Sequence, residues 1–149
     1  MKLVLVVEDE FGNREVLQLL LEAEGYRVQA ASNGKAALAL LAAEVPALIL
    51  SDFMMPTMNG AELGQAVRAD PALGLVPFVF MSATSEQVVR QSFRDYDAFL
   101  VKPFDIDTML ALVKRLCTQG RPHQPTSQEV GDSMRQLLKG IELPPGPER

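Results

Sequence analysis

The chain has 149 residues, of which 48% are hydrophobic and 22% charged, a composition typical of one globular domain. Nineteen acidic residues against fourteen Lys and Arg give a net charge of −5, which argues against the basic surface of a nucleic-acid-binding protein. A single cysteine, Cys117, excludes an internal disulfide, and the apolar runs are too short for a transmembrane helix or a signal peptide. We therefore expect a cytoplasmic protein that binds neither nucleic acid nor membranes.

Five short apolar runs predict strands buried on both faces of a parallel sheet. They span residues 3–7, 27–31, 47–50, 78–81 and 98–101. Segments with helical periodicity or strong helix formers follow each run, at residues 11–24, 35–44, 60–69, 85–93 and 105–118. Regular alternation of strand and helix predicts an α/β fold, a doubly wound parallel sheet covered by helices on both faces.

The composition changes at about residue 118, which predicts a domain over 1–118 and an appendage over 119–149. Five of the ten prolines lie in the appendage, as expected for linkers and coil. Thr126 to Glu129 fit a capping box and precede apolar residues at helical spacing. We therefore predict a Pro-rich linker, a short amphipathic helix and a terminal coil. That C-terminal helix could pack on its own domain or dock on a partner.

Polar side chains follow four of the predicted strands at their carboxyl ends, the edge where open parallel sheets bind ligands. They are Glu8, Asp9, Asp52, Ser82 and Lys102. Crowded carboxylates need a compensating cation, and an all-oxygen ligand set suits Mg²⁺. With Mg²⁺ bound, Asp52 could stay ionised as a nucleophile toward a phosphoryl group, while Lys102 and a hydroxyl stabilise the phosphoryl oxygens. The residues thus predict acyl-phosphate chemistry.

Four segments carry a specific resemblance when taken together and in order. They read VVEDE at 6–10, SDFMMPTMNG at 51–60, MSA at 81–83 and FLVKPF at 99–104. On these segments the chain resembles a response-regulator receiver domain of bacterial two-component signalling, over about residues 1–118. The resemblance implies a flavodoxin-like fold with five parallel strands in the order 2-1-3-4-5.

The resemblance also implies a role for each acidic residue. Asp52 would be the phosphoacceptor. Asp9 would be a direct Mg²⁺ ligand, Glu8 would hold the ion through water, and the main-chain carbonyl of Met54 would be a further contact. These residues together are the expected metal and phosphorylation site.

A second group of residues would make the switch that the resemblance implies. Ser82 would bond the phosphoryl group, Phe99 would follow with a change of rotamer, and Lys102 would pair first with Asp52 and then with the phosphate. The peptide bond between Lys102 and Pro103 is expected to be cis. The switching surface would span residues 84–114. One departure stands out, because Asp95-Tyr96 replaces the usual Gly-Ala pair before the last strand.

The function implied by the resemblance is that of a single-domain response regulator rather than an enzyme. A histidine kinase or phosphotransfer protein would supply the phosphoryl group, and a protein target would receive the output. A homodimer through 84–114 or the C-terminal helix is also possible. Two alternatives remain: a Mg²⁺-dependent phosphatase with an aspartyl nucleophile, and an adaptor that works without phosphorylation. The residues after Asp52, Phe53 and Met54, lack the acid that a phosphatase would use to protonate its leaving group.

Overall fold

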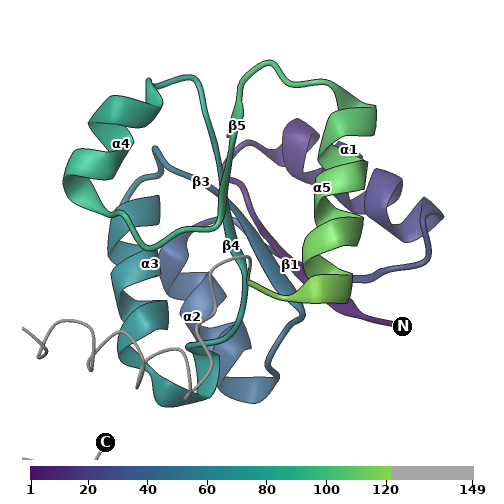
Figure 1. Cartoon of the computed structure of the whole chain (residues 1–149), viewed down its shortest axis with the longest axis horizontal. Helices are drawn as coiled ribbons and strands as arrows, with labels where there is room; N and C mark the ends of the chain where they lie inside the picture. The colour runs from purple at the N-terminus through teal and green to yellow at the C-terminus, as the bar shows by residue number, and fades with distance from the viewer. Residues whose placement is uncertain (122–149) are drawn as a thin grey trace, which may run out of the picture.

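The computed structural model describes residues 1–121 as a five-stranded parallel sheet between two layers of helices (Figure 1). The strands are β1 (Leu3–Val7), β2 (Arg27–Ala31), β3 (Leu48–Asp52), β4 (Phe78–Ser82) and β5 (Ala98–Val101). Their order in the sheet is β2-β1-β3-β4-β5, and every neighbouring pair is parallel. The predicted flavodoxin-like fold and strand order are confirmed.

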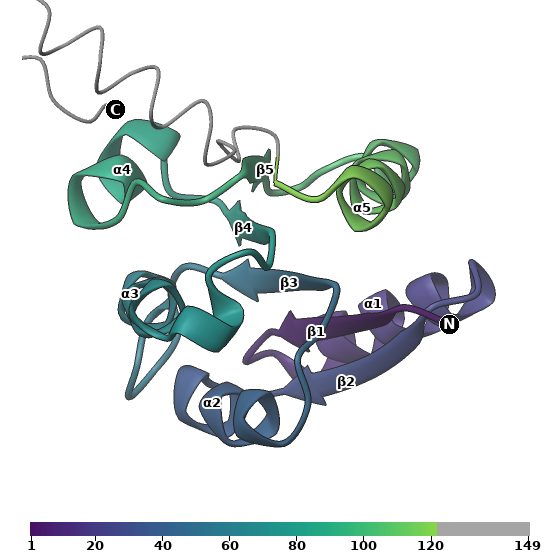
Figure 2. The same ribbon diagram turned by 60° about the horizontal axis from the view of Figure 1, so that its bottom comes forward.

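Helices cover both faces of the sheet (Figure 2). The described residues therefore form two hydrophobic cores, one on each face. The helices are α1 (Phe11–Ala23), α2 (Gly34–Ala43), α3 (Gly60–Ala69), α4 (Glu86–Ser92) and α5 (Ile106–Gln119). Buried residues of α1 and α5 pack with one face of the sheet, and those of α2, α3 and α4 with the other. Every residue of β1, β3 and β4 is buried, which explains why these strands are continuous apolar runs instead of alternating ones.

Side-chain caps fix where the helices begin. Asn33 and Asn59 belong to Asn-Gly pairs, and each is the N-cap of the helix that follows it. Asn59 forms a full capping box with Glu62, with hydrogen bonds of 2.9 and 3.0 Å. Asp105 is the N-cap of α5, and its side chain accepts a hydrogen bond from the amide of Thr108. The Asn-Gly pairs are therefore turns that lead into helices and not hairpin turns.

The remaining differences from the sequence predictions are local. The third strand runs from Leu48 to Asp52, so Asp52 is its last residue and does not follow it. A short 3₁₀ helix at Pro71–Leu73 was not predicted, and the helix ends differ by at most one residue. The predicted linker, amphipathic helix and coil of 122–149 lie outside the described residues. Within residues 1–121, none of the helices combines the length and hydrophobicity that crossing a bilayer requires.

Gly60 allows α3 to begin directly against the end of β3. A Cβ at this position would lie 2.4 Å from the carbonyl oxygen of Asp52 and 2.8 Å from the Phe80 ring. We predict that Gly60→Ala lowers the free energy of unfolding by about 1–3 kcal/mol, because backbone and a buried ring must both shift. Chemical denaturation measures this loss. Gly74→Ala is the matched control, since its new Cβ would meet nothing closer than 3.8 Å; an equal loss in both variants would contradict the steric explanation.

Candidate functional site

Three carboxylates meet at the carboxyl edge of the sheet. Glu8 and Asp9 follow β1, Asp52 ends β3, and one oxygen from each lies within 4.8 Å of the other two. Glu8 and Asp52 are buried, whereas Asp9 is exposed. The parallel pairing of β1 with β3 brings these two strand ends to the same edge. The sheet thus brings together the three acids that the sequence predicted.

Lys102 lies between the two buried carboxylates. Its Nζ is 2.5 Å from Oδ1 of Asp52 and 3.0 Å from Oε1 of Glu8. Lys102 follows β5, where its amide donates to the carbonyl of Ser82 at 2.9 Å, and its bond to Pro103 is cis as expected. The pairing of Lys102 with Asp52 was predicted. Its pairing with Glu8 was not, because the sequence gives no sign of how deeply Glu8 is buried.

The electrostatics of this cluster differ for its two buried acids. Burial and the neighbouring Glu8 carboxylate raise the pKa of Asp52 to about 8, in spite of Lys102. Burial opposes ionisation of Glu8 as well, but hydrogen bonds with Asp52 and Lys102 lower its pKa below the ordinary value. Lys102 can therefore compensate only one of the two buried carboxylates. The other carboxyl group, that of Asp52, keeps its proton at neutral pH unless a further cation is present.

The donor set of the cluster fits Mg²⁺. All three acids offer carboxylate oxygens, which hard divalent cations prefer, and a bound cation would supply the charge that lets Asp52 ionise. The exposed side of the cluster is formed by Asp9 and by Met54, whose side chain points largely into solvent. Both residues line the same surface pocket as Asp52. An ion could therefore reach the carboxylates from solvent.

Ser82 lines this pocket from the end of β4. Its side chain is buried, and its Oγ accepts a hydrogen bond of 2.9 Å from the amide of Thr84. A serine at the end of a strand could instead cap the helix that follows. Ser85 has that role, because its Oγ accepts from the amide of Val88 at the start of α4.

The unusual Asp95-Tyr96 pair places an additional aromatic ring beside Phe99. The Tyr96 ring centroid lies 5.3 Å from that of Phe80 and 6.2 Å from that of Phe99. Its hydroxyl donates to Glu86 at the start of α4, at 2.5 Å. Phe99 is partly buried against the same core. Tyr96 therefore joins α4 to the start of β5, and the switching role of Phe99 stays a prediction.

Two further residues form hydrogen bonds with Glu8. Nη1 of Arg14, in the first turns of α1, donates to the main-chain carbonyl of Glu8 at 2.8 Å. The amide of Glu10 donates to the Glu8 carboxylate at 3.2 Å. Glu10 belongs to the VVEDE segment, whereas Arg14 belongs to no motif. An arginine near the start of a helix gives no sign in the sequence that it contacts the loop before that helix.

Comparison with protein families gives a match over most of the chain. A family model described as the response regulator receiver domain matches residues 4–114. Response regulator Rre1 of Synechocystis is 34% identical over 154 residues, which cover 96% of this chain and 66% of Rre1. The chain thus spans slightly less than two thirds of that relative.

Solved structures give the same match in three dimensions. The signal receiver domain of a signal transduction histidine kinase from Syntrophus aciditrophicus has a TM-score of 0.75 and 31% identity, covering 85% of this chain and 96% of that one. Response regulator TrrA of Thermotoga maritima, solved in complex with Mg²⁺ and BeF, has a TM-score of 0.71 and 32% identity, covering 78% and 99%.

The exposed acid of the cluster allows a test of Mg²⁺ binding that leaves the core intact. We predict that Mg²⁺ at about ten times its Kd stabilises the protein by ~1.4 kcal/mol, and that Asp9→Asn loses most of this gain at the same concentration. Thermal unfolding with and without Mg²⁺ measures it. Glu15→Gln, which removes an exposed acid from α1, is the charge-matched control. Equal stabilisation of all three proteins would contradict a site at Asp9.

Proposed function

The chain belongs to the response regulator receiver family, and from this premise we propose that Asp52 accepts a phosphoryl group in a Mg²⁺-dependent reaction. The observation that carries the proposal is the position of Lys102, whose ammonium contacts both buried carboxylates at the sheet edge. Receiver domains are signalling switches, so the product of the reaction is a modified protein and not a released metabolite.

Transfer to Asp52 needs an ionised carboxylate within reach of a donor. An Oδ atom of Asp52 forms a bond to phosphorus while the bond from phosphorus to the donor's leaving atom breaks, and the leaving group keeps the electron pair. Bound Mg²⁺ would neutralise charge on the transferring phosphoryl oxygens. We propose that the ion is held by Asp9, Asp52 and the main-chain carbonyl of Met54, and by Glu8 through water.

Lys102 and Ser82 are proposed to stabilise the phosphorylated state. Lys102 is already 2.5 Å from Asp52, so its ammonium can move from the carboxylate to a phosphoryl oxygen without a large displacement. The Ser82 hydroxyl, which now accepts from the amide of Thr84, can donate to another oxygen. Phosphorylation adds about −1.5 to −2 charge, which strengthens both contacts. The surface of residues 84–114, which joins these two residues, would change with them.

The chemistry of the site defines the partners we propose. A histidine kinase or a phosphotransfer protein would donate the phosphoryl group, and a protein, or a second copy of this chain, would bind the changed 84–114 surface. Two-component signalling of this kind places the protein in the cytoplasm. No contact in the described residues favours the phosphatase alternative, because the side chains after Asp52 are the buried Phe53 and the exposed Met54.

The phosphoacceptor is tested directly by intact mass after incubation with a small phosphodonor, such as acetyl phosphate, and Mg²⁺. We expect one labile phosphoryl group per chain, and none in Asp52→Asn, because an amide cannot replace the carboxylate as nucleophile. Asp107→Asn, an exposed acid in the first turn of α5, is the matched control and should be phosphorylated as in the unmodified protein. An adduct that persists in Asp52→Asn would overturn the assignment.

A further inference from the structure

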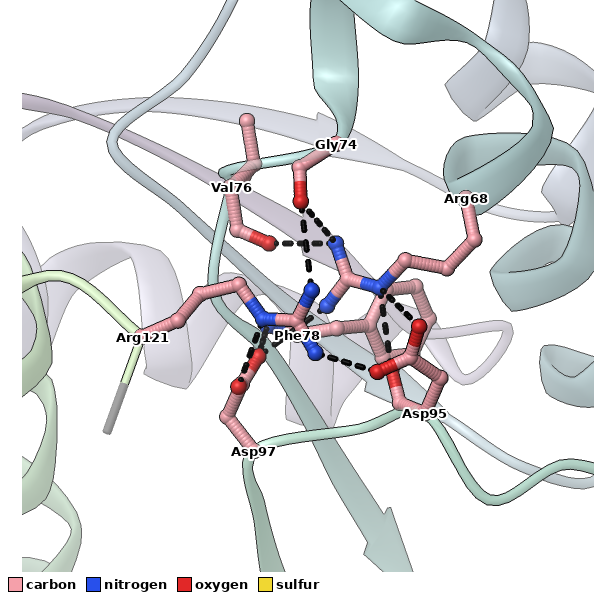
Figure 3. A network of polar contacts seen from close by, with 7 residues as sticks. All are labelled: Arg68, Gly74, Val76, Phe78, Asp95, Asp97 and Arg121. Atoms are coloured by element: carbon pink, nitrogen blue, oxygen red, sulfur yellow. Dashed lines mark hydrogen bonds and ion pairs between the residues drawn. The ribbon is translucent and has the colours of Figure 1, made fainter. Parts of the chain in front are cut away.

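Figure 3 shows a second cluster of charged residues. It lies at the start of β5, whereas Lys102 follows the end of that strand. It consists of Arg68 from α3, Asp95 and Asp97 from the loop between α4 and β5, and Arg121 just beyond α5. We call these four residues the Arg121 cluster. It joins three segments that are far apart in the sequence, and the site chemistry does not use any of them.

Asp97 is the fixed member of the cluster. Its side chain is only 4% exposed, and its carboxylate accepts from Arg68 at 3.0 Å, from Arg121 at 2.9 Å and from the amide of Phe78 at 2.8 Å. The amide of Asp97 in turn donates to the carbonyl of Phe78. A buried carboxylate with this many donors is costly to disturb, so Asp97 stays attached to the start of β4.

Asp95 is the loosely held member. Its side chain is 57% exposed, and Nη2 of Arg121 forms an ion pair with its Oδ1. Nε of Arg68 donates to its main-chain carbonyl at 2.9 Å and lies 3.6 Å from its carboxylate. Both arginines are also held by the carbonyl of Gly74. The arginines are therefore fixed by buried partners, while Asp95 can leave them at small cost.

The loop that carries Asp95 follows the most weakly packed helix. Val89 is the only buried residue of α4, whereas α5 buries Met109, Val113, Leu116 and Cys117. Helices with few buried contacts are the elements that move at low cost. The loop also leads into β5, and Lys102 follows this strand directly. A displacement that starts at the phosphorylation site can thus reach Asp95 through α4 or through β5.

We propose that the contact between Arg121 and Asp95 links the phosphorylation state of Asp52 to the packing of the loop before β5 against the end of α5. In the unphosphorylated protein this contact holds the end of α5, capped by Gly120, against the loop before β5. When Lys102 and Ser82 turn to the phosphoryl group, α4 and its loop shift, Asp95 leaves Arg121, and Asp97 keeps the framework in place. The inference rests on the proposed function, since it needs a modification at Asp52.

Thermodynamic reciprocity makes the link measurable at the phosphorylation site. A contact that favours the unphosphorylated state opposes binding of a phosphoryl mimic. We expect Arg121→Ala and Asp95→Asn, each in the full chain, to bind beryllofluoride with Mg²⁺ about 2–5-fold more tightly than the unmodified protein. The double variant should gain little beyond either single one, because both remove the same contact. Arg121→Lys, which keeps the charge, should show a smaller gain.

Hydrogen exchange of residues 93–97 supplies the second measurement. Saturating beryllofluoride should speed exchange there in the unmodified protein, and Arg121→Ala should show faster exchange before any addition. The control is Arg27→Ala, which removes an exposed ion pair with Glu44 near the far edge of the sheet and should leave affinity and exchange unchanged.

Two results separate this inference from the proposed function. If beryllofluoride saturates the site but the Arg121 and Asp95 variants bind it as the unmodified protein does, with unchanged exchange at 93–97, the link is overturned while phosphorylation stands. If Asp52 takes no phosphoryl group and binds no beryllofluoride, the proposed function fails, and the link fails with it.

Discussion

The contact of one lysine with two buried carboxylates is the interaction on which the rest of the site depends. Lys102 reaches Glu8 and Asp52 at 3.0 and 2.5 Å, and it can compensate only one of the two charges. Burial makes the second charge expensive, which is why the pKa of Asp52 rises to about 8. With both acids ionised, the site would therefore be one positive charge short. Such a site can bind a divalent cation, which supplies the missing positive charge. It can also bind a phosphoryl group, whose oxygens would accept the Lys102 ammonium from Asp52.

Most of this arrangement could be predicted from the sequence because it depends on strand ends. Buried parallel strands are visible as apolar runs, and their carboxyl ends share one edge, so Asp52 and Lys102 had to be near each other once the fold was known. The sequence likewise indicates that the Asn-Gly pairs are not hairpin turns, because neither pair lies between two alternating strand patterns. The order of the strands came from the resemblance to receivers and not from periodicity.

What the sequence could not supply depends on side chains that meet across distant segments. Nothing in the pattern around Glu8 shows that it pairs with Lys102, 94 residues away. Other contacts also join segments that are distant in the sequence and cannot be predicted from it. They are the hydrogen bond from Tyr96 to Glu86 and the ion pairs of Arg121 with Asp95 and Asp97. Asp95-Tyr96 was visible only as a departure from the family pattern. In the structure these two residues tie the loop before β5 to α4 on one side and to the end of α5 on the other.

The central claim is that the buried acid pair carries one proton until a cation displaces it, and the titration of Asp52 measures this most directly. ¹³C NMR of the Asp52 carboxyl carbon should show it protonated below neutral pH in Mg²⁺-free protein, with a pKa of about 8, and ionised over that range when Mg²⁺ is saturating. A carboxyl that titrates near the ordinary value of 3.8 without Mg²⁺, or that is unchanged by the ion, would contradict the account.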